Sequence, residues 1–135
     1  MTVTGRMVWE QAMHLLGYTS DDGALSGRDE LLPRALAVVN QIYTDLWYTP
    51  GGCLPDAGIP PGSEETEPTR LSSLDEPVPL STRALTDVMP WGVAMLMAQS
   101  ESDGDSQALM SMTYNAKRAV LSRMGKREDV LPWPV

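Results

Sequence analysis

The 135-residue sequence contains no phenylalanine and only one histidine and one cysteine, His14 and Cys53. A single histidine excludes a two-histidine metal site within the chain, and a single cysteine excludes an internal disulfide. Cys53 has no basic neighbour in the sequence, and a Cys53–His14 pair is the only nucleophilic arrangement that these two residues leave open. We expect His14 to be an ordinary half-exposed side chain and the protein not to be an enzyme.

The sequence also has no long hydrophobic run. The uncharged apolar stretch from Val88 to Ala98 covers eleven residues, whereas a helix that crosses a bilayer needs about 20. Arg6 and Glu10 interrupt any apolar leader at the N-terminus. We therefore expect neither a membrane span nor a secretory signal.

Basic residues are scarce, with 10 Lys and Arg against 18 Asp and Glu, which gives a formal net charge of −8. Binding to the phosphates of nucleic acid needs a basic surface, so this chain is not expected to coat DNA. Half of the basic residues fall within positions 117–127, but Glu128 and Asp129 follow directly. This cluster favours a helix end or a face toward an acidic partner over a nucleic-acid site.

Two further motifs are incomplete. Asp103-Gly-Asp105 is similar to the start of a calcium loop, but Ala116 stands roughly where a bidentate glutamate is needed. The glycine pair before Cys53 lacks the Lys and Ser/Thr of a phosphate loop. We expect no cofactor and no resident metal ion.

Hydrophobic periodicity predicts an all-α protein with about four helices, at residues 5–16, 29–47, 82–100 and 106–124. Gly17 and Gly125 are expected to end the first and last helices, and Ser81 to cap the third. In the last helix the predicted core stripe is Leu109, Met112, Ala116, Ala119 and Val120.

The third predicted helix has a proline, Pro90, inside the most apolar segment of the chain. Proline removes one backbone hydrogen bond, so a kink is expected there. Beyond Pro90 the helix is apolar on every side, which is typical of a helix at the centre of a bundle.

Between the second and third helices, residues 49–68 are rich in Gly and Pro and end in the acidic cluster Glu64, Glu65 and Glu67. Such a stretch is either disordered or functional. Residues 69–81 then form an extended arm or a short edge strand. We predict one helical domain at 1–125, with 49–80 as inserted loop and arm, and an extended tail at 126–135.

The tail carries the apolar residues Val130, Leu131, Trp133 and Val135. An apolar tail of this kind either folds back on its own bundle or anchors a partner.

Four segments follow one another in the sequence: "RMVWEQAMHLLGYT", "LLPRALAVVNQIYTDLW", "LSSLDEPVPLS" and "ALTDVMPWGVAMLMAQSESDGDSQALMSMTYNAKRA". In this order they resemble the small helical head–tail connector (adaptor) proteins of tailed bacteriophages. Within the last segment, "PWGVA" at 90–94 is similar to the apolar-helix motif of that family, and Tyr114, Asn115, Lys117 and Arg118 are similar to its Y-N-x-K-R motif. The likeness covers residues 7–124. The Gly/Pro loop departs from the family pattern.

This resemblance implies a structural protein of the virion neck, assembled in the host cytoplasm. It implies a homo-oligomeric ring, expected as twelve copies, which joins the portal protein to a stopper or tail-completion protein while DNA passes through its channel. The portal-binding element would be the tail, with Lys126, Val130, Leu131, Trp133 and Val135. The acidic loop residues Glu64, Glu65 and Glu67 would face the channel or a neighbour.

Ring contacts are expected at the aromatic end of the second helix and on the basic face of the last. The candidate residues are Tyr43, Trp47, Tyr48, Lys117, Arg118 and Arg123. The alternative is a non-enzymatic helical interaction module of a cellular assembly. An enzyme or cofactor protein is the remaining alternative.

Overall fold

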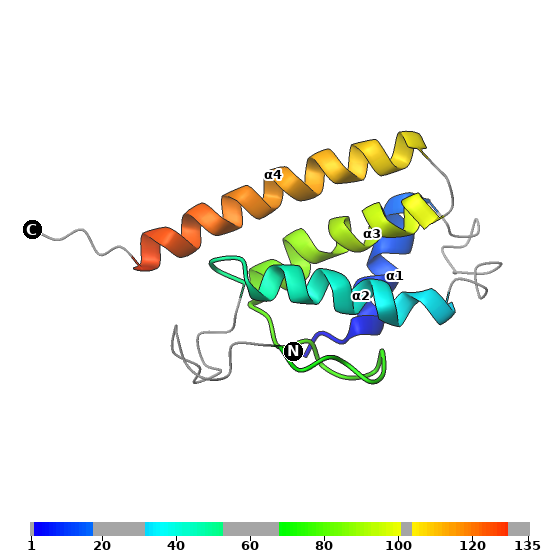
Figure 1. Ribbon diagram of the computed structural model, residues 1–135, viewed down its shortest axis with the longest axis horizontal. Coiled ribbons are helices and arrows are strands. Elements are labelled where there is room, and N and C mark those ends of the chain that lie inside the picture. The colour runs from blue at the N-terminus through cyan, green and yellow to red at the C-terminus, as the bar shows by residue number, and fades with distance from the viewer. Residues whose placement is uncertain (1, 18–31, 53–67, 101–103, 130–135) are drawn as a thin grey trace, which may run out of the picture.

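A computed structural model describes residues 2–17, 32–52, 68–100 and 104–129 of the chain (Figure 1). The elements are α1 (Gly5–Leu16), α2 (Leu32–Trp47), the π-helical turn η3 (Ala84–Val88), α3 (Met89–Ser100) and α4 (Gly104–Asp129). These ranges hold four packed helices and no strand, with one isolated antiparallel bridge between Thr4 and Pro77. The predicted all-α class is confirmed.

Local capping sets the bounds of α1. The Thr4 hydroxyl oxygen accepts a hydrogen bond from the Met7 backbone N–H at 3.3 Å. Gly17 ends the helix at φ 76°, in the left-handed region, and its N–H donates to the His14 carbonyl at 3.0 Å. This end confirms the predicted role of Gly17, because a glycine adopts that conformation at no steric cost.

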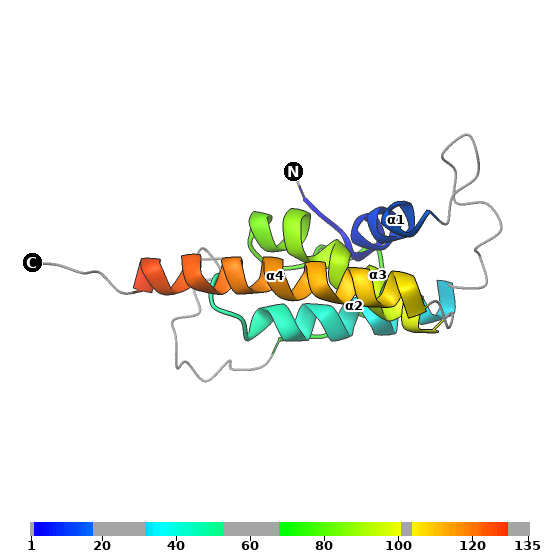
Figure 2. The same cartoon turned by 90° about the horizontal axis from the view of Figure 1, so that it is seen from above.

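The central helix is α3, which packs against α1, α2 and α4. Figure 1 shows α3 between α4 and α2, with α1 crossing behind it, and Figure 2 shows the same arrangement from above. Val93, Ala94 and Met97 are fully buried. The prediction of a central helix that is apolar all round is therefore confirmed.

A kink is predicted at Pro90, and the structure has a π turn directly before this residue, at Ala84–Val88. The Met89 N–H bonds to the Ala84 carbonyl, five residues back, and η3 runs directly into α3. A proline ring conflicts with the carbonyl four residues before it, which here belongs to Thr86. The wider turn replaces the regular α-helical register just where the proline disrupts it.

The arm after residue 68 belongs to the core. Leu71, Leu74, Val78 and Leu80 are buried. The buried Asn40 side chain of α2 pairs with the backbone of Leu71: its Nδ2 donates to the Leu71 carbonyl at 3.0 Å, and its Oδ1 accepts from the Leu71 N–H at 2.8 Å. The arm, predicted to be extended, is not extended throughout, because residues 72–76 form a bend and a turn in which the Glu76 N–H donates to the Ser73 carbonyl at 3.3 Å. It is held on α2 by the Asn40 side chain, and it forms no edge strand.

Ser81 joins the arm to the start of the next helical segment. Its hydroxyl oxygen accepts from the Ala84 N–H at 3.2 Å, which confirms the predicted cap. The same hydroxyl donates to the Gly51 carbonyl at 2.8 Å. Ser81 therefore also fixes the chain just after α2.

The last helix corrects three predictions. It begins at Gly104 and continues through Gly125 to Asp129, so Gly125 does not end it and residues 126–129 of the predicted extended tail are helical. Among residues 104–123 of this helix, Met110, Tyr114 and Leu121 are buried, whereas Leu109, Met112 and Val120 are exposed. Ala116 and Ala119 are also exposed. The stripe predicted to face the core therefore lies on the opposite, solvent-facing side of α4.

Several predicted features lie outside the described residues. These are most of the Gly/Pro loop with Cys53, Glu64, Glu65 and Glu67, and the tail residues Val130, Leu131, Trp133 and Val135. None of the helices in the described ranges is long and apolar enough to cross a membrane.

Candidate functional site at the junction of α4 with α2 and α3

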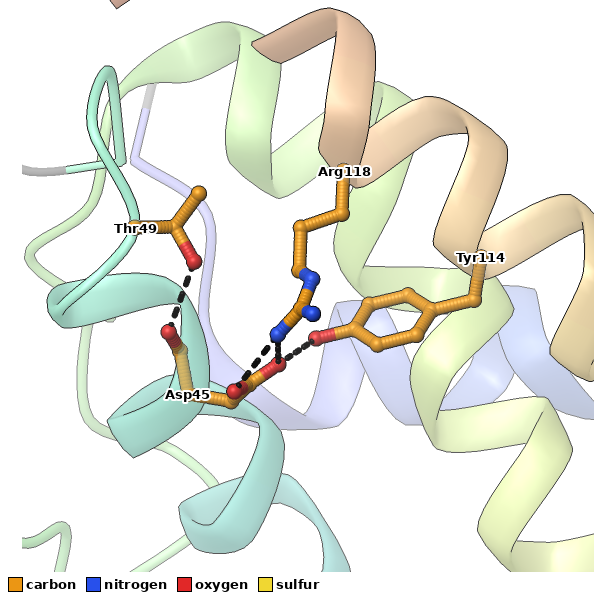
Figure 3. Close-up of polar contacts among 4 residues, drawn as sticks. All are labelled: Asp45, Thr49, Tyr114 and Arg118. Atoms are coloured by element: carbon orange, nitrogen blue, oxygen red, sulfur yellow. Dashed lines mark hydrogen bonds and ion pairs between the residues drawn. The ribbon is translucent and has the colours of Figure 1, made fainter. Parts of the chain in front are cut away.

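The junction of α2 and α4 is centred on the Asp45 carboxylate (Figure 3). It accepts a hydrogen bond from the Tyr114 hydroxyl and two from Nη1 of Arg118, at 2.9 Å to each oxygen. The Thr49 hydroxyl donates to the Asp45 backbone carbonyl at 2.8 Å. A carboxylate near the C-terminal end of a helix is unfavourable by itself, so the cation from α4 offsets the helix dipole at this point.

Burial and the neighbouring carboxylate set the protonation of the Tyr114 hydroxyl. Burial raises the pKa of Tyr114 well above its ordinary value, and the hydrogen bond to Asp45 raises it further. The phenol therefore stays neutral and donates a hydrogen bond to Asp45. The Arg118 and Asp45 side chains are 40% and 39% exposed, so solvent screens their attraction.

A second ion pair joins α4 to the π turn. Lys117 Nζ lies 2.9 Å from Oδ1 of Asp87 and 5.7 Å from the centroid of the Trp91 ring. The ammonium thus contacts a carboxylate and an aromatic face together. Lys117 and Arg118 are adjacent on α4, but Lys117 forms an ion pair with η3 and Arg118 forms one with α2.

The close approach of α3 and α4 depends on a glycine. A Cβ atom placed on Gly92 would lie 2.7 Å from Cε1 of Tyr114 and 3.0 Å from Cγ2 of Ile42. Tyr114 therefore fills the space that a side chain at position 92 would occupy.

The predicted ring-contact residues divide into two groups. Tyr43 is buried beside Trp47, with ring centroids 6.2 Å apart, and Lys117 and Arg118 form ion pairs within the chain. Tyr48 and Arg123 are exposed. Tyr48 and Arg123 are therefore more accessible to a neighbouring subunit than Tyr43 is.

Charge is unevenly distributed along the chain. The described ranges hold nine of the ten basic residues and eight of the eighteen acidic ones, a formal charge of +1. The remaining residues, 1, 18–31, 53–67, 101–103 and 130–135, hold ten acidic residues and one basic residue, a formal charge of −9. The helical body is therefore close to neutral, and the connecting segments carry the acidity.

The described part of the chain contains no group of three or more His, Cys, Asp or Glu side chains that could hold a metal ion. His14 is exposed on α1, and Cys53 lies outside the described ranges. The contacts at the α4 junction are neutral and charge-assisted hydrogen bonds. Chemically, this arrangement holds helices in register.

Sequence reasoning missed Asp45 and Asn40. A signal for Asp45 was present, because an acidic residue in the last turn of an apolar helix calls for a cationic partner. Asn40 lies midway along α2, directly after the buried Val39, and a buried polar side chain there needs a partner. The partner itself, Leu71, is 31 residues away in sequence.

Comparisons of the chain with protein-family models, with curated proteins and with solved structures give no match.

Proposed function

We propose that this protein is a structural subunit of a head–tail connector (adaptor) ring of a tailed bacteriophage. In this role it docks under the portal, joins the capsid to the stopper or tail-completion protein, and surrounds the channel for DNA. The proposal rests on the resemblance of the sequence to that family, and the following features of the fold support it.

The observation that carries the proposal is the packing of the two resemblance motifs on each other. Gly92 of "PWGVA" receives the ring of Tyr114, and Trp91 lies under the ammonium of Lys117. Arg118 of the second motif is bound to Asp45 of α2. Residues 22 or more positions apart thus form one junction, as expected if the two motifs specify a single structural unit.

The charge distribution supports a place beside DNA. The acidic residues are concentrated between the helices, including Glu64, Glu65 and Glu67 in the long loop. Acidic walls repel the phosphates of DNA and leave it mobile in a channel. We propose that these loop residues face the channel or a neighbouring subunit.

The direction of α4 supports a docking role for the tail. Its C-terminal end extends past the ends of α2 and α3 in both views (Figures 1 and 2). Lys126 lies on this part of the helix, and Val130, Leu131, Trp133 and Val135 follow it in sequence. An apolar tail at the end of a projecting helix is suited to insertion into a partner surface.

Co-sedimentation with portal rings tests the proposal, with the portal protein taken from the genome that encodes this chain. We expect the full chain to sediment with the portal and deletion of residues 126–135 to abolish binding. The matched control is Met7→Ala, which removes an exposed apolar side chain from α1 and is expected to leave binding unchanged.

Absence of portal binding by the full chain would contradict the proposal and favour an interaction module of a cellular assembly. Equal binding by the truncated and full chains would show that the tail is not the docking element. In the bound complex, twelve copies per portal ring are expected, joined by head-to-tail contacts.

A further inference from the structure

The solvent-facing side of α4 is apolar over several turns. Met112 is 73% exposed, Leu109 is 58% exposed and Val120 is 37% exposed. Ala108, Ala116 and Ala119 on the same side are exposed as well. Large apolar side chains on one exposed helix face are costly to leave in water and mark an interaction surface.

Six exposed residues of this face follow one another at alternating intervals of four and three. They are Asp105, Leu109, Met112, Ala116, Ala119 and Arg123, and we call them the outer seam. This alternation is the repeat with which two helices pack along a common line. The face turned to the body of the protein is a different one, which contains Met110, Tyr114 and Leu121.

The outer seam is complementary to itself in the antiparallel direction. About a centre at residue 114, Leu109 lies opposite Ala119, and Met112 lies opposite Ala116. A large side chain thus faces a small one at each apolar level, which allows close packing. At the two ends, Asp105 lies opposite Arg123, and their opposite charges fix the direction.

We propose that the outer seam of α4 binds the outer seam of a second copy of this chain, with the two helices antiparallel. In the parallel direction, Asp105 would face Asp105 and Arg123 would face Arg123, and like charges would repel. Binding to an unrelated partner would not require the outer seam to be complementary, in side-chain size and charge, to a reversed copy of itself. The observed pattern therefore favours a second copy as the occupant.

Such a contact is isologous, because each copy uses the same surface and the pair closes with twofold symmetry. A ring repeats a head-to-tail contact between two different surfaces. The two interfaces are separate, and this inference does not rest on the proposed function. Two isolated subunits would form this closed pair through their α4 helices alone.

Sedimentation velocity of the full chain over a wide range of concentrations tests the pairing. We expect the mass to rise from one copy to two with concentration. Met112→Glu places a charge at the middle of the seam and should weaken the pair on the order of tenfold or more. The matched control is Met7→Glu, at a side chain 41% exposed on α1, which should leave the dissociation constant unchanged.

A charge exchange tests the direction. Asp105→Arg and Arg123→Asp should each weaken pairing, since each brings like charges together across the seam. A mixture of the two variants should form the pair again, because every facing set is then of opposite charge. In a parallel pair, by contrast, the wild type and each variant alone have like charges at both levels, so neither substitution would weaken pairing. Circular dichroism of each variant checks that α4 is retained.

A wild-type chain that stays monomeric at all concentrations would overturn the inference. So would a dimer or larger species that persists unchanged in Met112→Glu, or a mixture of the exchanged variants that fails to pair. Loss of portal binding with an intact pair would count against the proposed function alone.

Discussion

Tyr114 of α4 occupies the space above Gly92 of α3, so that a Cβ atom at position 92 would come within 2.7 Å of its ring. The hydroxyl of the same tyrosine donates a hydrogen bond to Asp45 of α2. One side chain therefore sets the spacing between α3 and α4 by its ring and the position of α2 by its hydroxyl. Three helices meet at this residue.

Gly92→Ala should destabilise the fold by about 1–3 kcal/mol, because the new methyl group overlaps the Tyr114 ring and approaches Ile42. Chemical denaturation measures the change. Gly104→Ala is the matched control, since a Cβ atom there meets no atom within 4 Å, and it should not reduce stability. Equal stability of the two variants would show that α3 and α4 can move apart at no cost.

Asp45→Ala should cost about 2 kcal/mol, because the partly buried Tyr114 hydroxyl and the Arg118 guanidinium lose their common acceptor. The half exposure of the ion pair keeps this cost below that of a buried one. Asp75→Ala removes an exposed partner of Arg6 and should leave the unfolding midpoint unchanged. The prediction fails if the two substitutions have the same effect.

Tyr114 should make stability depend on pH in the alkaline range. Burial raises its pKa above the ordinary value of 10.0, so above about pH 10 the unfolded chain loses a proton that the folded protein keeps. The unfolded state then binds fewer protons, and the free energy of unfolding falls as pH rises.

Tyr114→Phe should therefore flatten the alkaline part of the stability profile, measured by denaturation at successive pH values. It should also lower stability at neutral pH by about 1–2 kcal/mol through the lost hydrogen bond. The exposed Tyr48 is the control position, and Tyr48→Phe should keep the wild-type slope. An alkaline slope unaltered in Tyr114→Phe would contradict the account of this site.

Asn40→Ala should be the most damaging polar substitution, at about 2–4 kcal/mol, because it leaves the buried N–H and carbonyl of Leu71 without their partner. Hydrogen exchange at the Leu71 amide should become faster. Asn115→Ala changes an exposed asparagine on α4 and should alter neither quantity. Slow exchange at Leu71 in Asn40→Ala would show that other contacts hold the arm.

Local signals predicted much of this fold. The end of α1 at Gly17 and the cap at Ser81 depend on neighbouring backbone atoms only, and both predictions are confirmed. The face of α4 could not be chosen locally. That helix has apolar residues on two sides, and its buried side includes Tyr114 together with the half-buried Lys117 and Arg118, whose stems cover apolar surface while their charges find partners.

The polar contacts were less accessible to sequence reasoning than the helices. Asp45 and Arg118 are 73 residues apart, and Asn40 and Leu71 are 31 apart. Hydrophobic periodicity shows which residues share a helix face but does not show which distant polar groups meet. The basic residues Lys117 and Arg118 form an evident cluster in the sequence, but their partners Asp87 and Asp45 are set by the packing of the helices.

We propose that this chain is a ring subunit between portal and tail. The most direct test is a cryo-electron microscopy reconstruction of the neck of virions produced by the genome that encodes it. The account predicts a ring of this four-helix fold beneath the portal, with residues 126–135 of each copy in contact with the portal. A neck in which other proteins account for all the density, with this chain absent from the purified virion, would contradict it.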